Sequence, residues 1–181
     1  MSKIIEAEIP SHALSAKYLE EGAFVDCYYI EIPEEITLDK YIEAFYTTPL
    51  FKVERTILSI ATFKSATDRD AAELSLGKSS SYSIWTVESR KSNQVLLCDF
   101  TRKTRSWLMV KTSKNEDSVI SRLFFGSVVV PSKVSESGHA SFGLLFHLFS
   151  RFHLSYSKAL LNAAYKKLLR KNKHIKNIKN A

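Results

Sequence analysis

Between Ser79 and Pro131 the chain carries four short apolar runs in close succession, and this pattern constrains the fold most. The runs are YSIWTVES, QVLLCDF, RSWLMVKT and VISRLFFGSVVV, and the polar segments RKSN, TRKT and KNED separate them. Short alternating runs joined by compact polar turns are typical of antiparallel hairpins. We therefore expect a meander of about four strands, with Gly126 allowing the last strand to bend.

The segments before this meander predict a strand and two or three helices. AFVDCYYIEI, at residues 23–32, is rich in β-branched and aromatic residues and predicts a strand. Thr37 can cap a helix through TLDKYIEAFY, and Pro49 suits the first turn of a second helix that extends to about Lys64. Residues 65–78 predict either a short third helix or a loop.

The longest helical pattern of the chain follows Pro131 and the polar connector SKVSESGH. Its apolar residues recur at helical spacing and form one stripe, which consists of Leu145, Phe149, Phe152, Tyr156, Leu160 and Ala163. A curved antiparallel sheet must bury one face, and a helix of this length can cover it. The expected fold class is therefore α+β of the helix-grip type, with the sheet wrapped around a long C-terminal helix. Its interior is either a ligand cavity or a filled core.

Length and composition agree with one globular domain over residues 1–181. The chain is 45% hydrophobic and 25% charged, which are ordinary values for a folded domain. Cys27 and Cys98 are too few for a disulfide scaffold. The N-terminus lacks the pattern of a secretory signal, and no run of about 18 apolar residues occurs in the sequence. These features favour a soluble, cytoplasmic protein.

The net charge of +7 is concentrated at one end of the chain. Residues 1–136 hold 17 basic and 19 acidic residues, whereas residues 137–181 hold 9 basic residues and no acidic one. We interpret residues 166–181 as a basic tail, either a solvated helix end or a weak contact with anionic membranes. The residues that would make this contact are Lys166, Lys167, Arg170 and Lys171. No nucleic-acid partner is expected, because the tail lacks stacking aromatic residues after Tyr165.

Four segments carry a resemblance to a known family. They are TTPLFKVERTIL at 47–58, DFTRKTRSWLMV at 99–110, RLFFGSVVVP at 122–131 and FHLSYSKALL at 152–161. In that order they resemble an uncharacterised bacterial family associated with the START-like (SRPBCC) helix-grip superfamily. That superfamily includes the birch pollen allergen, lipid-transfer domains and polyketide cyclases. The resemblance implies a hydrophobic cavity and no particular substrate, and the chain departs from the full seven-stranded sheet because about five strands are expected.

Six residues are candidates for lining such a cavity or holding a ligand: Trp85, Trp107, Arg105, Phe149, His153 and Tyr156. The two tryptophans and Phe149 supply apolar area, as a core would also require. Arg105 can face Asp99 across the turn at residues 101–104, where the pair would either fix the register or anchor a ligand carboxylate. His153 and Tyr156 can donate hydrogen bonds or act as an acid and a base.

Metal and cofactor chemistry are not expected. His147 and His153 lie six residues apart on one predicted helix, about 240° apart around its axis, and cannot chelate an ion together. The chain contains none of the motifs GxxxxGK[ST], GxGxxG, GxSxG or HExxH.

Three functions stay open at this point. The first is a helix-grip protein that binds a small hydrophobic or amphipathic molecule between sheet and C-terminal helix without turnover. The second is an enzyme of the cyclase or dehydratase type on the same fold, in which Arg105, His153 or Tyr156 orients the substrate and moves a proton. The third is an interaction or membrane-peripheral protein that uses the basic helix end.

Overall fold

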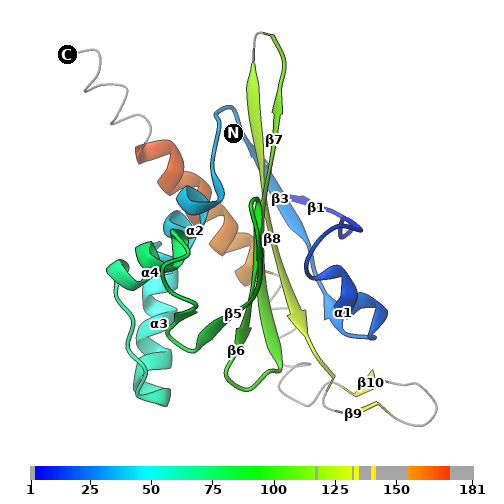
Figure 1. Ribbon diagram of the computed structural model, residues 1–181, viewed down its shortest axis with the longest axis vertical. Helices are drawn as coiled ribbons and strands as arrows, with labels where there is room; N and C mark the ends of the chain where they lie inside the picture. The colour runs from blue at the N-terminus through cyan, green and yellow to red at the C-terminus, as the bar shows by residue number, and fades with distance from the viewer. Residues whose placement is uncertain (1–2, 117, 132, 135–139, 142–154, 172–181) are drawn as a thin grey trace.

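The computed structural model describes residues 3–116, 118–131, 133–134, 140–141 and 155–171. The helices are α1 (Ala16–Glu20), α2 (Leu38–Tyr46), α3 (Pro49–Thr62), α4 (Asp68–Ser75) and a C-terminal helix at 155–171. The strands are β1 (Ile5–Glu6), β2 (Phe24–Val25), β3 (Tyr28–Ile32), β4 (Ser81–Tyr82), β5 (Trp85–Lys91), β6 (Gln94–Asp99), β7 (Thr104–Lys114), β8 (Val119–Val129), β9 (Lys133–Val134) and β10 (Ala140–Ser141). Figure 1 shows their arrangement.

Eight strands form one antiparallel, curved and unclosed sheet in the order β1-β3-β8-β7-β6-β5-β4, with β2 also paired to β8. The four consecutive strands β5 to β8 are the expected meander, which is confirmed together with the α+β class. The last meander strand, β8, pairs on its other side with β3, the strand that precedes the helices. The sheet is larger than the five strands expected because the two-residue strands β1 and β4 at its margins had no readable pattern, and because the expected strand at 23–32 is divided into β2 and β3.

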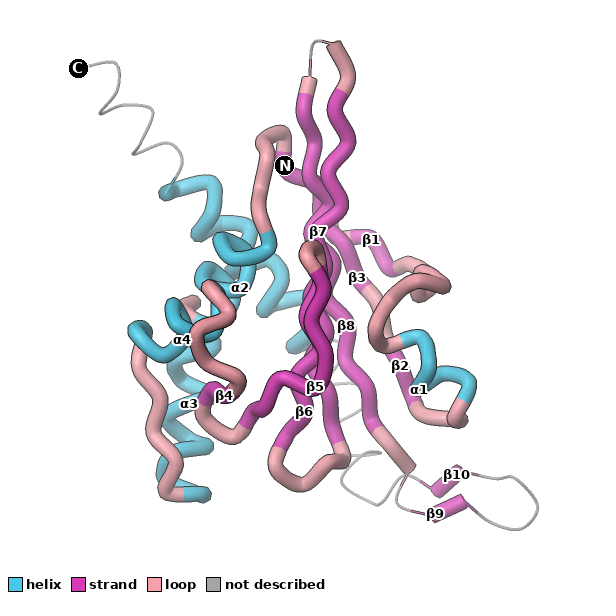
Figure 2. Tube along the Cα trace, viewed as in Figure 1, coloured by secondary structure: helices cyan, strands magenta, loops and turns pink. Residues whose placement is uncertain are grey.

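The two faces of the sheet are covered by different parts of the chain. Helices α2, α3 and α4 and the helix at 155–171 lie on one side, and the N-terminal segment with α1 lies on the other (Figure 2). We call these the helix face and the N-terminal face. Side chains alternate between them along β7: Leu108 packs on the helix face, whereas Trp107 and Met109 pack on the N-terminal face.

The helix face holds the larger core. Tyr41, Ile42 and Phe45 of α2 are almost fully buried there, and the helix at 155–171 adds Leu161 and Ala164, both 0% exposed. The sheet therefore packs against a group of helices, of which the C-terminal helix is one member. Residues 65–78 form a helix rather than a loop, because Thr67 and Asp70 make a reciprocal capping box at the start of α4. The earlier part of the expected C-terminal helix, at 142–154, lies outside the described residues.

The second core, on the N-terminal face, was not predicted. Cys27, Trp107 and Phe124 pack there under residues 7–25. Gln94 attaches this segment, since its Oε1 accepts hydrogen bonds from Leu14 N at 2.8 Å and Trp107 Nε1 at 3.0 Å. Its Nε2 donates to the carbonyl of His12 at 3.1 Å. A buried amide thus joins the segment to the sheet.

Candidate ligand site between the sheet and the C-terminal helix

The sequence-predicted site residues do not converge on one cavity. Trp85 and Tyr156 pack against the helix-face core, whereas Trp107 lies in the N-terminal-face core. Arg105 shares the N-terminal face, because it is two residues from Trp107 on β7 and contacts Tyr18 of α1. The expectation of one void touching both tryptophans is therefore wrong. Phe149 and His153 lie outside the described residues.

The expected pairing of Asp99 with Arg105 is also wrong. In the β6–β7 ladder Arg105 stands opposite Cys98, and Asp99 stands opposite Trp85 in the neighbouring ladder. The Asp99 carboxylate instead closes the turn after β6, where its Oδ1 accepts from the backbone N–H groups of Lys103 at 2.9 Å and Thr104 at 3.0 Å. Its role is to shape that turn.

Arg105 belongs to a polar cluster under α1. Its Nε donates to Glu88 Oε2 at 3.1 Å, and its guanidinium stacks 4.5 Å from the centre of the Tyr18 ring. Glu88 Oε1 also accepts from Lys17 Nζ at 2.7 Å and from the Tyr18 hydroxyl at 2.5 Å. Tyr18, Glu88 and Arg105 border a pocket of about 520 Å³, which Cys98 also lines. Burial raises the pKa of the Cys98 thiol, which disfavours the nucleophilic thiolate.

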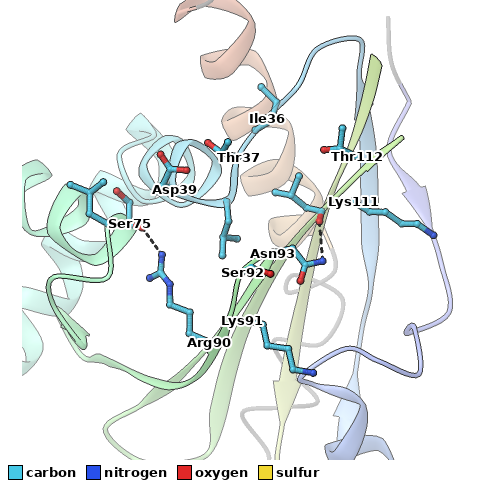
Figure 3. Close-up of a pocket in the computed structure, with 13 residues that line it drawn as sticks. Ile36, Thr37, Asp39, Ser75, Arg90, Lys91, Ser92, Asn93, Lys111 and Thr112 are labelled. Atoms are coloured by element: carbon cyan, nitrogen blue, oxygen red, sulfur yellow. Dashed lines mark hydrogen bonds between the residues drawn. The ribbon is translucent and has the colours of Figure 1, made fainter. Parts of the chain in front are cut away.

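A second pocket, of about 700 Å³, lies between the start of α2, the end of α4 and the turn from β5 to β6 (Figure 3). Its most prominent cation is Arg90, whose guanidinium donates to the carbonyls of Leu74 at 2.7 Å and Ser75 at 2.5 Å. These carbonyls belong to the last turn of α4, so Arg90 caps that helix. Asn93 likewise donates to the carbonyl of Val110 at 3.3 Å. Arg90 and Asn93 of this pocket therefore hold the fold together.

The helix face contains a buried carboxylate that the sequence analysis missed. Asp26 is 7% exposed and lies between β2 and β3. Its Oδ1 accepts from the Ser127 backbone N–H at 2.6 Å and from the Ser127 hydroxyl at 2.7 Å, and its Oδ2 accepts from the Ser157 hydroxyl at 3.3 Å. The available signal was an acid in the first half of the apolar run AFVDCYYIEI, which holds two acids, Asp26 and Glu31. Asp26 joins the connection between β2 and β3 to β8 and to the C-terminal helix.

Tyr28 lies two residues from Asp26 on the same face. The residue is 0% exposed, and its hydroxyl has no hydrogen-bond partner among the residues that the structure describes. Lys158 Nζ lies 4.8 Å from the centre of its ring. Burial, followed by the negative charge of Asp26, raises the pKa of Tyr28, so its hydroxyl stays protonated and can donate. A buried donor without an acceptor is costly in a folded protein and needs a physical explanation, of which a bound molecule is one.

A second polar pair joins the same helix to α3. The Tyr156 hydroxyl donates to the Glu54 carboxylate in a short contact. Burial raises the pKa of Glu54, and the hydrogen bond from Tyr156 opposes this shift. Burial also raises the pKa of Tyr156, with a contribution from the Glu54 charge. We refer to Asp26, Tyr28, Glu54, Ser127, Tyr156 and Ser157 as the interior polar cluster.

The arrangement does not combine Arg105 and Tyr156 as one catalytic pair. They lie on opposite faces of the sheet, and the sheet itself separates them. Trp85 lies on the helix face, and its indole N–H also lacks a partner among the described residues. Of the expected site residues, Tyr156 is the one that belongs to the interior polar cluster.

Two of the four basic residues proposed for membrane contact bind within the protein. Lys167 Nζ donates to the carbonyl of Thr47 at 2.7 Å and to its hydroxyl at 2.5 Å, at the end of α2. Lys171 Nζ lies 3.3 Å from Glu43 Oε1. Lys166 and Arg170 are exposed. The described part of this helix is thus anchored to α2 through its basic residues.

In the described ranges, no group of three or more His, Cys, Asp or Glu side chains could hold a metal ion. None of the described helices has the length and apolar character needed to cross a membrane. Comparisons with protein-family models, curated proteins and solved structures find no match to this chain. The resemblance to a START-like family stays a prediction.

Proposed function

We propose that this protein binds a small amphipathic molecule between the helix face of its sheet and the C-terminal helix, in a START-like helix-grip fold without turnover. The observation that carries the proposal is the Tyr28 hydroxyl, a buried donor lacking an acceptor among the described residues. A ligand with a carbonyl or hydroxyl oxygen at its polar end would supply that acceptor. Its apolar part would lie among the aromatic and aliphatic side chains of the helix-face core.

The surroundings of Tyr28 support this choice of ligand. A ligand carboxylate beside Asp26 would meet the negative charge of that residue, and Lys158, the cation beside the Tyr28 ring, already pairs with Glu6 at 3.5 Å. A neutral polar end avoids that repulsion. The pairing of β8 with β3, which lets one continuous sheet surround the helix side, also supports the helix-grip assignment.

Binding can be tested with Nile red, a neutral apolar dye that carries a carbonyl oxygen. Fluorescence titration of the full chain should give saturable binding, and Tyr28→Phe should weaken it about fivefold, because one hydrogen bond is lost. Tyr29→Phe is the matched control, since Tyr29 packs on the N-terminal face. Equal affinities of both variants and the native chain would place the dye elsewhere and contradict the proposal.

Native mass spectrometry identifies the natural occupant. The protein isolated from the cells that produce it should carry a reproducible adduct of a few hundred daltons that disappears in the denatured spectrum. Tyr28→Phe should reduce the bound fraction, whereas Tyr29→Phe should retain it. An adduct that both variants keep equally would argue against the interior polar cluster as its site.

A further inference from the structure

One end of the molecule exposes an unusual amount of apolar surface. The solvent-facing side of α3 presents Ile57 at 62% and Ile60 at 73% exposure, and Phe63, just past the helix end, is 95% exposed. Phe100, in the turn between β6 and β7, is 57% exposed. The end of α3 and this turn lie at the same end of the protein (Figure 1). Exposed aromatic residues grouped in this way mark interaction surfaces more often than single exposed leucines do.

Cations surround these apolar residues. Lys64 Nζ lies 5.8 Å from the centre of the Phe100 ring, which joins the end of α3 to the β6–β7 turn. Arg102 and Lys103 are exposed in the same turn. We call Ile57, Ile60, Phe63, Lys64, Phe100, Arg102 and Lys103 the basic aromatic surface.

Acidic residues do not balance this charge. Residues 55–67 and 100–115 contain no aspartate or glutamate. The nearest acids in sequence are already engaged: Asp99 accepts from the backbone of the turn, and Asp68 pairs with Lys52 and Arg55. The surface is therefore positively charged and apolar together, as a protein surface that meets an anionic bilayer must be.

Two of the three non-glycine residues with positive φ in the described part of the chain lie on this surface. Phe63 has φ of 57° and Arg102 has φ of 59°, and both values lie in the left-handed region that favours glycine. Phe63 ends α3 at a position where glycine or asparagine is the usual residue. A side chain that is 95% exposed gains no packing energy there. Left-handed backbone at residues other than glycine is concentrated at functional sites.

We propose that the basic aromatic surface docks the protein on an anionic lipid bilayer, with Phe63 and Phe100 inserted among the headgroups and Lys64, Arg102 and Lys103 against lipid phosphates. This inference concerns a different surface from the interior polar cluster and does not depend on ligand binding. It also differs from contact through the basic helix end, because Lys167 and Lys171 are engaged within the fold.

Vesicle co-sedimentation of the full chain tests the proposal. Phosphatidylcholine vesicles containing 30% phosphatidylserine should retain the protein, pure phosphatidylcholine should retain much less, and salt should weaken the binding. The double substitution of Arg102 and Lys103 by alanine should lower the partition coefficient at least fivefold, because each cation near an anionic surface contributes about that factor.

Phe63→Asn distinguishes an effect on membrane docking from an effect on the stability of the fold. Asparagine is better tolerated at positive φ, so this variant should be at least as stable to urea as the native chain while its partition coefficient falls several-fold. Leu19→Asn, on α1 and 56% exposed, is the matched control and should bind as the native chain does. The proposal is overturned if the native chain does not bind anionic vesicles, or if Phe63→Asn binds them as strongly as the native chain does. It is also overturned if the double variant Lys166→Ala and Arg170→Ala loses vesicle binding instead.

Discussion

Gly126 marks the place where β8 passes closest to the backbone between β2 and β3. A Cβ atom at this position would lie 2.5 Å from the carbonyl oxygen of Asp26 and 3.0 Å from Trp107 Cε3. The sequence predicts that this glycine lets the strand bend. In the structure, a glycine is needed because the backbone of Asp26 leaves no room for a Cβ atom. The same approach brings Asp26 within reach of Ser127, so this glycine helps to position the interior polar cluster.

Gly126→Ala should therefore destabilise the protein by about 2 kcal/mol or more, because neither backbone nor indole can yield without moving the core. Gly77→Ala provides the comparison, since Gly77 has φ of +70° but a Cβ atom there would lie no closer than 3.9 Å to the Arg90 side chain. That substitution should cost about 1 kcal/mol from backbone strain alone. Urea unfolding measures both, and a larger loss for Gly77→Ala would contradict this explanation.

At the scale of elements, Glu88 connects α1 to the sheet. Burial opposes ionisation of Glu88, but hydrogen bonds from Lys17, Tyr18 and Arg105 outweigh it and lower the pKa below the usual 4.5. The carboxylate of β5 thus binds two residues of α1 and one of β7. Because α1 has only five residues, these contacts rather than helix propensity hold it in place.

This connection predicts an acid-sensitive part of the stability. The folded state binds a proton at Glu88 less readily than the unfolded chain, so the stabilisation is present above pH of about 4.5 and is lost as pH falls through the lower folded pKa. Glu88→Gln should be less stable than the native chain at neutral pH, and the difference should shrink on acidification. Urea unfolding from neutral pH down to about pH 3 measures it. Glu20→Gln, exposed on α1, should show no such convergence.

The elements also show which features a sequence can predict. The meander was predictable because alternation and turn residues are local, and α4 has its capping box within residues 67–70. The face of the sheet on which Trp85 and Trp107 lie was not predictable. It depends on the strand register, which shifts between Val87 and Ser89. Asp26 was missed because its hydrogen-bond partners, Ser127 and Ser157, lie 101 and 131 residues away in the chain. Tyr28 was missed because its burial depends on packing between distant parts of the chain.

At the scale of the whole molecule, the sheet separates two cores, and no side chain of the described residues belongs to both. Leu161 is 0% exposed on the helix face, and Met109 is 0% exposed on the N-terminal face. Replacing a buried side chain of this size by alanine leaves a cavity and removes apolar burial. The two sites are separated by the thickness of the sheet, so their effects should be independent.

Leu161→Ala and Met109→Ala should each destabilise the protein by about 2–5 kcal/mol, and the double variant by the sum to within about 0.5 kcal/mol. Urea unfolding followed by circular dichroism provides the three values. Leu161→Ala combined with Ala164→Gly, on the same helix, is the comparison in which coupling is expected. A strongly non-additive result for Leu161 and Met109 would mean that the sheet transmits strain between its faces.

The sheet ends at β1 on one side and β4 on the other, and each of these strands has only two residues. An open sheet normally exposes two rows of unpaired backbone N–H and C=O groups, which recruit strands from other molecules. These two strands are too short to serve as such a template themselves, but β1 pairs with only Tyr28 and Tyr29 of β3, and β4 pairs with only Trp85 and Thr86 of β5. The outer edge of β5 beyond Thr86 is therefore the place where a strand from another molecule would extend this unclosed sheet.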